Sequence, residues 1–372
     1  MINRIINCFD KNPVNTERQR ELDIAKGFII IFMALSHAIE ILGWFFAPQT
    51  SDGFFWHGFD MIIKGSAPVF MVCMGISLCY SKRQSAKDTF RRALNTAGIV
   101  VLLEISRTAI PCFIEWLIFR DPESMVYATE IVCVDILQFA TMTFLAFAFL
   151  KKMKIGLVPT LVIAGVCSIA GQLLQGVSFG SVILDRIVGF LWNSNPTAFF
   201  PFLNWFIVPV IGYALGSLWQ RLKDKDTFFK LVTPLSLDIT VGYYASMVFV
   251  GEWYYFSGGD YCGIGIIDVA FMLVIFFLVV GGCYYFSKIS SRSARYFESM
   301  GIRLTSVYCI HWTIYCFLYL LLVCVMGDNY LPLWTVPPVA AIVFISSDIL
   351  SRFYKNHKGR KAVKSAVTDK KQ

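Results

Sequence analysis

The chain has 372 residues, of which 56% are hydrophobic and only 16% are charged, and its mean hydropathy is +0.62. Soluble domains are nearer to about 45–50% apolar and about 25% charged. This composition therefore excludes an ordinary soluble fold, which would have too few polar side chains to cover its surface. The formal net charge of +8 would suit a nucleic-acid partner, but its placement along the chain is that of a membrane protein, and we expect no nucleic-acid partner.

The first segment, residues 1–25, is polar and lacks the apolar core and small-residue cleavage site of a signal peptide. We therefore expect the first helix to remain in the mature protein. A bilayer core of about 30 Å requires roughly 20 apolar residues of helix. Ten such segments follow, at residues 27–47, 60–80, 93–118, 130–150, 155–175, 199–219, 231–250, 264–286, 304–326 and 332–350. They predict an all-α polytopic bundle of about ten transmembrane helices over residues 26–350, and a basic tail over residues 351–372 that we expect to be disordered.

The positive charges give the orientation of these segments. Of the 33 Lys and Arg residues, 28 lie in the two polar ends and in the even-numbered connections, whereas the odd-numbered connections hold only Arg120 and Arg186. Short cytoplasmic loops carry an excess of Lys and Arg. The pattern predicts an even number of helices, both termini in the cytoplasm, and a multi-pass protein of the cell membrane. Most of the eleven Cys lie in apolar segments without a CxxC pair, so we expect reduced thiols and no metal site.

Ionisable side chains at membrane depth are costly and often mark function. In the first segment His37 and Glu40 are three residues apart, on one helix face. A carboxylate beside an imidazole can hold its tautomer and raise its basicity, as general-base catalysis requires. The alternative is a buried pair that only joins helices.

Four more polar residues lie in the third and fourth segments. Glu104 and Arg107 are three residues apart in one, and Asp135 and Gln138 in the other. Proton transfer on a bound substrate and proton or ion translocation both fit these residue types. For Glu104 and Arg107, an internal ion pair that only neutralises itself is the alternative.

Two other histidines accompany aromatic residues. His311 lies beside Trp312 in the ninth segment, where a satisfied packing group is the ordinary interpretation. His57 follows Trp56 in the first outer connection, where interfacial packing and an active-site role are both open. From residue types alone, the set fits proton transfer on a bound substrate, proton or ion transport, or a scaffold held together by polar contacts.

Five segments, in order and at matching helix numbers, resemble membrane acyltransferases of the heparan-alpha-glucosaminide N-acetyltransferase type and of the broader acyltransferase-3 group. The opening matches an LDxxRG pattern with a His eleven residues after the Arg, except that Lys26 replaces the Arg. The matching segments are Arg20–Gly27 with His37, Ala67–Ser77 followed by Arg91 and Arg92, Asp135–Gln138, Phe200–Trp205 through Gly212 and Gly216, and Ser306–Trp312.

The resemblance implies transfer of an acyl group, usually acetyl, from cytoplasmic acyl-CoA to a hydroxyl or amine of a sugar acceptor. By position it implies that His37, oriented by Glu40, is the catalytic base, and His57 is the possible counterpart of a catalytic His in the first luminal loop of eukaryotic relatives. Lys26, Arg91 and Arg92 would hold the anionic part of acyl-CoA. Arg107 or Gln138 would stabilise the oxyanion at the donor carbonyl. A proton-coupled transporter that uses the same groups is the alternative function.

Overall fold

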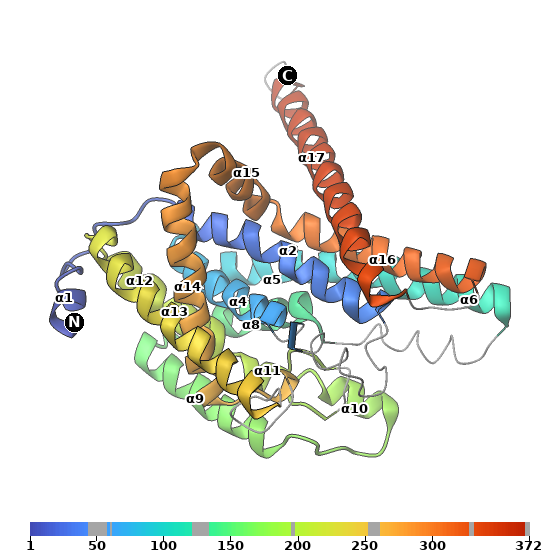
Figure 1. Cartoon of the computed structure of the whole chain (residues 1–372), viewed down its shortest axis with the longest axis horizontal. Helices are drawn as coiled ribbons and strands as arrows, with labels where there is room; N and C mark the ends of the chain where they lie inside the picture. The colour runs from blue at the N-terminus through green and yellow to red at the C-terminus, as the bar shows by residue number, and fades with distance from the viewer. Residues whose placement is uncertain are drawn as a thin grey trace. The chain divides into compact units, whose positions relative to one another are not determined.

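The computed structural model describes residues 1–43, 58–59, 62–120, 134–194, 198–251, 261–326 and 331–368. Within these ranges the chain is helical and contains no β-strand, only two isolated bridges (Figure 1). The chain forms two compact units. Unit 1 comprises Met1–Leu22 and Ala67–Ile289, and unit 2 comprises Asp23–Ser66 and Ser290–Gln372.

In unit 1, some packed helices follow one another in the sequence and others are separated by further helices. Its helices are α1 (Ile2–Ile6), α4 (Ser66–Cys79), α5 (Ala86–Glu104), η1 (Ile105–Ala109), α6 (Ile110–Phe119), α8 (Ile136–Lys152), α9 (Leu157–Leu173), α10 (Val182–Val188), α11 (Phe202–Trp205), α12 (Ile207–Trp219), α13 (Lys225–Val250), η3 (Tyr261–Gly263) and α14 (Ile266–Ile289). Helix α5 packs along α8, α13 along α14, and α9 against α11 and α12.

Helices α5 and α6 form one helical rod, in which the π-helical turn η1 connects the two α-helices. The turn ends where the N–H of Ile110 donates to the carbonyl of Ile105, five residues back. Pro111 follows immediately and has no N–H to continue the α-helical ladder. The wider turn therefore lies where the proline would otherwise disrupt the helix, and it also carries Arg107 into a buried position.

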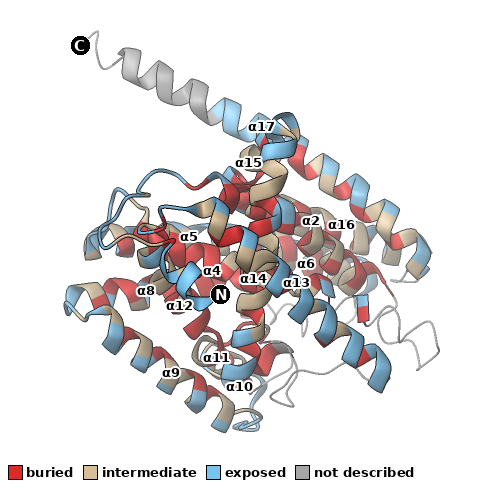
Figure 2. Cartoon of the chain, turned by 60° about the vertical axis from the view of Figure 1, so that its left-hand side comes forward, coloured by how far each residue is buried: buried red, intermediate tan, exposed pale blue. Residues whose placement is uncertain are grey.

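Helix α4 is buried along most of its length (Figure 2). Its contact with α12 depends on glycine. A Cβ on Gly75 would collide with the carbonyl oxygen of Pro209, and one on Gly212 would collide with that of Val72. Because glycine has no side chain, the two backbones approach closely, a common way to join helices in membranes.

The polar N-terminal segment is packed on unit 1. Its backbone N–H groups at Val14 and Asn15 both donate to the carbonyl of Gln220 at 2.8 Å, after the end of α12. The buried carboxylate of Glu21 accepts a hydrogen bond from Lys225 at 2.7 Å, at the start of α13. These contacts fix the segment to the α12–α13 turn.

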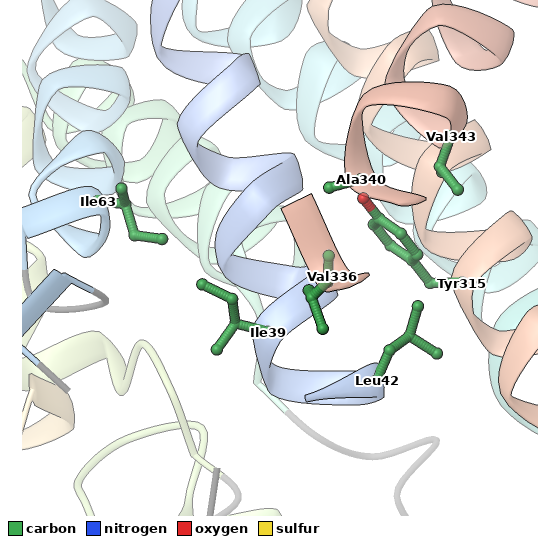
Figure 3. Packing of buried hydrophobic residues seen from close by; sticks show 8 residues of the cluster. Ile39, Leu42, Ile63, Tyr315, Val336, Ala340 and Val343 are labelled. Atoms are coloured by element: carbon green, nitrogen blue, oxygen red, sulfur yellow. The ribbon is translucent and has the colours of Figure 1, made fainter. Parts of the chain in front are cut away.

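Unit 2 contains α2 (Arg20–Leu42, from Asp23 onward), α15 (Ser291–Ile302), α16 (Leu304–Met326), η4 (Leu333–Thr335) and α17 (Val336–Thr368). A buried hydrophobic cluster joins α2, α16 and α17 (Figure 3). Tyr315 of α16 lies fully buried in that cluster beside Ile39 of α2 and Val336 of α17. Its hydroxyl donates to the carbonyl of Ala34 at 2.9 Å, so the polar end of the ring is satisfied inside the core.

The predicted all-α polytopic membrane class is confirmed. Among the described residues, seven helical stretches are long and apolar enough to cross a bilayer: Arg20–Leu42, Ile62–Cys79, Ala86–Phe119, Phe202–Trp219, Ile266–Ile289, Leu304–Val325 and Leu333–His357. Helices α8, α9 and α13 occupy the other three predicted segments. The number of ten spans, the cytoplasmic termini and the domain boundaries at residues 25 and 350 stay predictions.

The prediction of a disordered arm after Arg352 is wrong for most of that segment, since α17 continues to Thr368. The residues that follow Arg352 contain no proline and are rich in Lys, which is a good helix former. The helix therefore extends beyond the apolar part of the segment.

Candidate active site

His37 and Glu40 meet on one face of α2, as their spacing predicts. Nδ1 of His37 lies 3.3 Å from Oε2 of Glu40, and the two side chains are 15% and 30% exposed. A carboxylate can only accept, so this contact favours the tautomer with the proton on Nδ1. The other ring nitrogen, Nε2, is buried and has no hydrogen-bond partner among the described residues. In this tautomer Nε2 carries the lone pair that a general base needs.

Three aromatic side chains of α16 surround the His37 ring. The His311 ring is stacked on it, with centroids 5.5 Å apart and planes at 19°. The Trp312 ring centroid is 4.2 Å away, and Tyr308 presents an edge at 6.1 Å. Nδ1 of His311 lies 2.9 Å from the carbonyl of Val307, which can only accept, so this nitrogen carries a proton. His311 is fully buried, and the stack holds the plane of the His37 ring.

The start of α2 lies against α15. The ammonium of Lys26 lies 2.7 Å from Oδ1 of Asp23, and the Lys26 side chain is largely buried. A Cβ on Gly27 would collide with the carbonyl of Phe297, and one on Gly301 would collide with that of Asp23. The glycine of the LDxxKG motif therefore permits contact between two backbones, and the Lys26 charge is balanced within its own helix.

A buried ion cluster in unit 2 was not predicted. Arg303, one of the positive charges predicted to lie in a cytoplasmic connection, is buried and donates to Oδ1 of Asp348 at 2.7 Å. Oδ2 of Asp348 accepts from Arg352 at 2.7 Å and from the hydroxyl of Tyr296 at 3.1 Å. The cluster joins α15 and its C-cap residue Arg303 to α17. An Asp near the end of an apolar segment was the only signal for it in the sequence.

Unit 1 contains a second buried network, which joins the α5–η1 rod to α8. The guanidinium of Arg107 donates to Oε1 of Glu104 at 2.6 and 3.0 Å and to Oδ2 of Asp135 at 2.7 Å. Gln138 donates to the same Glu104 oxygen at 2.6 Å. The predicted pairs thus form one cluster. Because Arg107 directs its donors at two carboxylates, the geometry favours a role in joining helices.

Arg91 and Arg92 lie in the second turn of α5 and differ in environment. Arg91 is exposed. Arg92 is half-buried, donates to the hydroxyl of Ser81 at 3.1 Å, and lies over the ring of Phe144 at 5.5 Å from its centroid. Both lie in the N-terminal part of α5, and the contacts with Ser81 and Phe144 restrain the Arg92 side chain.

The predicted residues divide between the two units. Unit 2 holds Lys26, His37 and Glu40, and unit 1 holds Arg91, Arg92, Arg107 and Gln138. His57 lies outside the described residues. In the described part of the chain, no group of three or more His, Cys, Asp or Glu side chains is arranged to hold a metal ion.

Residues 18–243 match the family model described as the catalytic domain of heparan-alpha-glucosaminide N-acetyltransferase. The chain belongs to this family. The resemblance noted in the sequence is thereby confirmed, and the family indicates a membrane acetyltransferase. No curated protein and no solved structure matches the chain.

The family match covers α2 with His37 and Glu40, and the whole Glu104–Arg107–Asp135–Gln138 network. It ends within α13, so His311 lies beyond it. The helix that carries the candidate base therefore lies inside the part of the chain that matches the heparan-alpha-glucosaminide N-acetyltransferase family. The contact with His311 comes from the structure alone.

Proposed function

We propose that the protein transfers an acetyl group from cytoplasmic acetyl-CoA to a hydroxyl or amine of a sugar-containing acceptor, with His37 as the general base. Family membership supports the reaction class. The geometry of His37 is the observation that carries the residue assignment. One ring nitrogen faces Glu40, while the other is buried and has no hydrogen-bond partner among the described residues.

In this mechanism Nε2 of His37 removes the proton from the acceptor O–H or N–H group. The freed electron pair forms a bond to the thioester carbonyl carbon. When the tetrahedral intermediate collapses, the C–S bond breaks and CoA leaves as a thiolate, which takes the proton from His37. Glu40 stabilises the transient imidazolium by its charge, as a carboxylate does for a general base. An alternative two-step route would form an acyl-enzyme first.

The residues that bind acetyl-CoA stay predictions. Lys26, Arg91 and Arg92 are cations near the predicted cytoplasmic ends of their helices and suit phosphate groups. Lys26 already has Asp23 as a partner, so it would bind the donor in competition with that carboxylate. Arg107 and Gln138 were predicted to steady the oxyanion. Their contacts with Glu104 support an indirect role, in which they hold α5 and α8 together.

The test is transfer of radiolabelled acetyl from acetyl-CoA to methyl α-D-glucosaminide by the purified full-length protein in liposomes. The sugar is chosen because the family description names a glucosaminide. We expect label in the sugar and release of one CoA for each acetyl group transferred. Wild-type protein that is folded but transfers no label to this or other amino sugars and alcohols would contradict the proposal.

The transporter alternative makes a different prediction for the same liposomes. It requires a substrate-dependent proton flux without CoA release. The buried carboxylates Glu104 and Asp135 would be its proton carriers, since they outnumber the single cation, Arg107, in their network. A pH-sensitive dye inside the liposomes distinguishes the two functions, because the transferase predicts product without net flux.

A further inference from the structure

A second cation lies beside Arg92, on the neighbouring helix. The ammonium of Lys151, in the last turn of α8, donates to the hydroxyl of Thr89 at 3.3 Å. Thr89 and Arg92 are three residues apart on one face of α5. The Arg92 guanidinium in turn lies over Phe144, two helical turns before Lys151 on α8. Each cation thus reaches across the α5–α8 contact, and the two side chains are neighbours.

Both cations are half-buried and neither has an acidic partner among the described residues. Their contacts are neutral: the hydroxyls of Ser81 and Thr89, and the aromatic faces of Phe144 and Tyr213. Partly buried charges are normally paired, because removing water from a cation costs free energy. Two like charges in one place increase that cost. Two more deeply buried cations among the described residues, Arg107 and Arg303, do have carboxylate partners.

We propose that Arg92 and Lys151 form a binding site for a phosphate group, and that Lys151 is a donor-binding residue in addition to those the sequence indicated. The identification of the ligand as the phosphate-bearing end of CoA rests on the proposed function. The same chemistry would also hold the phosphate of an anionic lipid headgroup. Arg92 supplies a planar, multidentate donor and Lys151 a point charge, which together suit a phosphate dianion.

The experiment measures CoA binding to full-length protein in detergent by calorimetry, with Lys151→Gln and Lys152→Gln compared. Lys152 is the next residue and is exposed, so the second variant removes the same charge from the same helix end. We expect Lys151→Gln to weaken CoA binding by about tenfold, since a charge-assisted hydrogen bond is lost. Lys152→Gln should change CoA affinity by less than about twofold, because the exposed Lys152 acts on the ligand only through electrostatics that solvent screens. Pantetheine lacks the phosphates, so neither substitution should change its binding, and Lys151→Arg should restore CoA binding.

A second arm measures the increase in melting temperature caused by phosphatidylglycerol relative to phosphatidylcholine. In one outcome, Lys151→Gln abolishes this increase in melting temperature while it leaves CoA binding unchanged; in another, it abolishes the increase and even the wild type binds no CoA. In either case the phosphate site stands with a lipid as its ligand, and its assignment to CoA fails. If wild type binds CoA but Lys151→Gln and Lys152→Gln behave alike in both arms, the phosphate site is overturned while the proposed acetyl transfer stands. Gel filtration and circular dichroism confirm that each variant is folded.

Discussion

At the scale of single residues, the proposed role of His37 as a base depends on how two neighbours hold its ring. Glu40 contacts Nδ1 at 3.3 Å and thereby fixes the tautomer. Glu40→Gln keeps an acceptor for Nδ1 but removes the negative charge that stabilises the protonated ring in the transition state. We expect kcat to fall by about 10²-fold, in the range of acid–base contributions. Single-turnover kinetics with labelled acetyl-CoA measures it, and an unchanged kcat would show that Glu40 is not the orienting group.

His311 is expected to act through the orientation of the His37 ring, because the rings are stacked at 19° and 5.5 Å. His311→Ala removes the stacked ring and leaves a cavity, which in a core costs about 3–5 kcal/mol for an aromatic side chain. His311→Phe keeps a flat ring of similar size. We expect His311→Phe to retain most of the activity and His311→Ala to lose both activity and thermal stability. Equal loss in both variants would instead assign a direct chemical role to the His311 nitrogens.

The sequence predicted the His37–Glu40 contact because residues three apart share a helix face. It could not predict the stack on His311, since helical periodicity says nothing about which residues of distant helices meet. The same limit applies to the Arg303–Asp348 pair. In contrast, the Glu104–Arg107 pair was predictable from spacing, although its union with Asp135 and Gln138 required the packing of α5 on α8.

At the scale of helices, the contact between α2 and α15 is made backbone to backbone at Gly27 and Gly301. Gly27→Ala would force the helices apart, and overpacking of this kind costs about 1–3 kcal/mol. Gly98→Ala in α5 is the matched control, because its added methyl would meet nothing within 4 Å. We expect a lower melting temperature for Gly27→Ala only. Equal melting temperatures for the two variants would contradict the close approach.

The segment before α10 provides a pH-dependent contact outside the predicted spans. Asp185 accepts hydrogen bonds from the Phe179 N–H at 2.6 Å and from the Ser178 hydroxyl at 2.7 Å. These donors hold the pKa of Asp185 below its ordinary value of 3.8. The ionised carboxylate is therefore more favourable in the folded state than in the unfolded chain, and it stabilises the fold. This stabilisation is present above pH 3.8 and is lost as the pH falls through the lower folded pKa.

Asp185→Asn tests this contact. We expect the wild type to melt at a higher temperature than the variant near pH 7, and the difference to shrink as the pH is lowered from about 4 toward the folded pKa. The measurement is the melting temperature of both proteins across pH in the same detergent. A difference that is constant with pH would show that the charge of Asp185 is not what stabilises the segment.

Sequence could locate most helices because long apolar segments between charged connections leave few alternatives. It missed α15, which is short and amphipathic with little net hydrophobicity. It also missed the π-helical turn at Ile105–Ala109, since no pattern of apolar residues distinguishes it from α-helix. Pro111 was the available signal, and it became interpretable only with the backbone hydrogen bonds.

At the scale of the whole molecule, the positive charges predict that both ends of the chain are cytoplasmic. Fusion of an epitope tag after Gln372, or before Met1, tests this directly by protease treatment of intact cells. We expect both tags to survive until the membrane is permeabilised, since Lys and Arg are concentrated on that side. Cleavage of one tag in intact cells would mean an odd number of spans.

The division into two units could not be predicted from sequence, because unit 2 combines α2, near the start of the chain, with α15, α16 and α17 at its end. Contacts between segments so distant in the chain leave no local signature. The family match covers residues 18–243 and so extends over the candidate base but not over α15, α16 and α17. For those helices the structure is the source of the assignments.

The most direct test of the central claim is the acetyl-transfer rate of His37→Gln in full-length protein, with acetyl-CoA affinity measured in parallel. We expect transfer to fall by about 10²–10⁴-fold while acetyl-CoA affinity stays within about twofold of wild type, because a general base acts on the acceptor proton and not on donor binding. His57→Gln, measured alongside, is expected to retain activity. Full activity in His37→Gln with loss in His57→Gln would contradict the account and assign the base to His57.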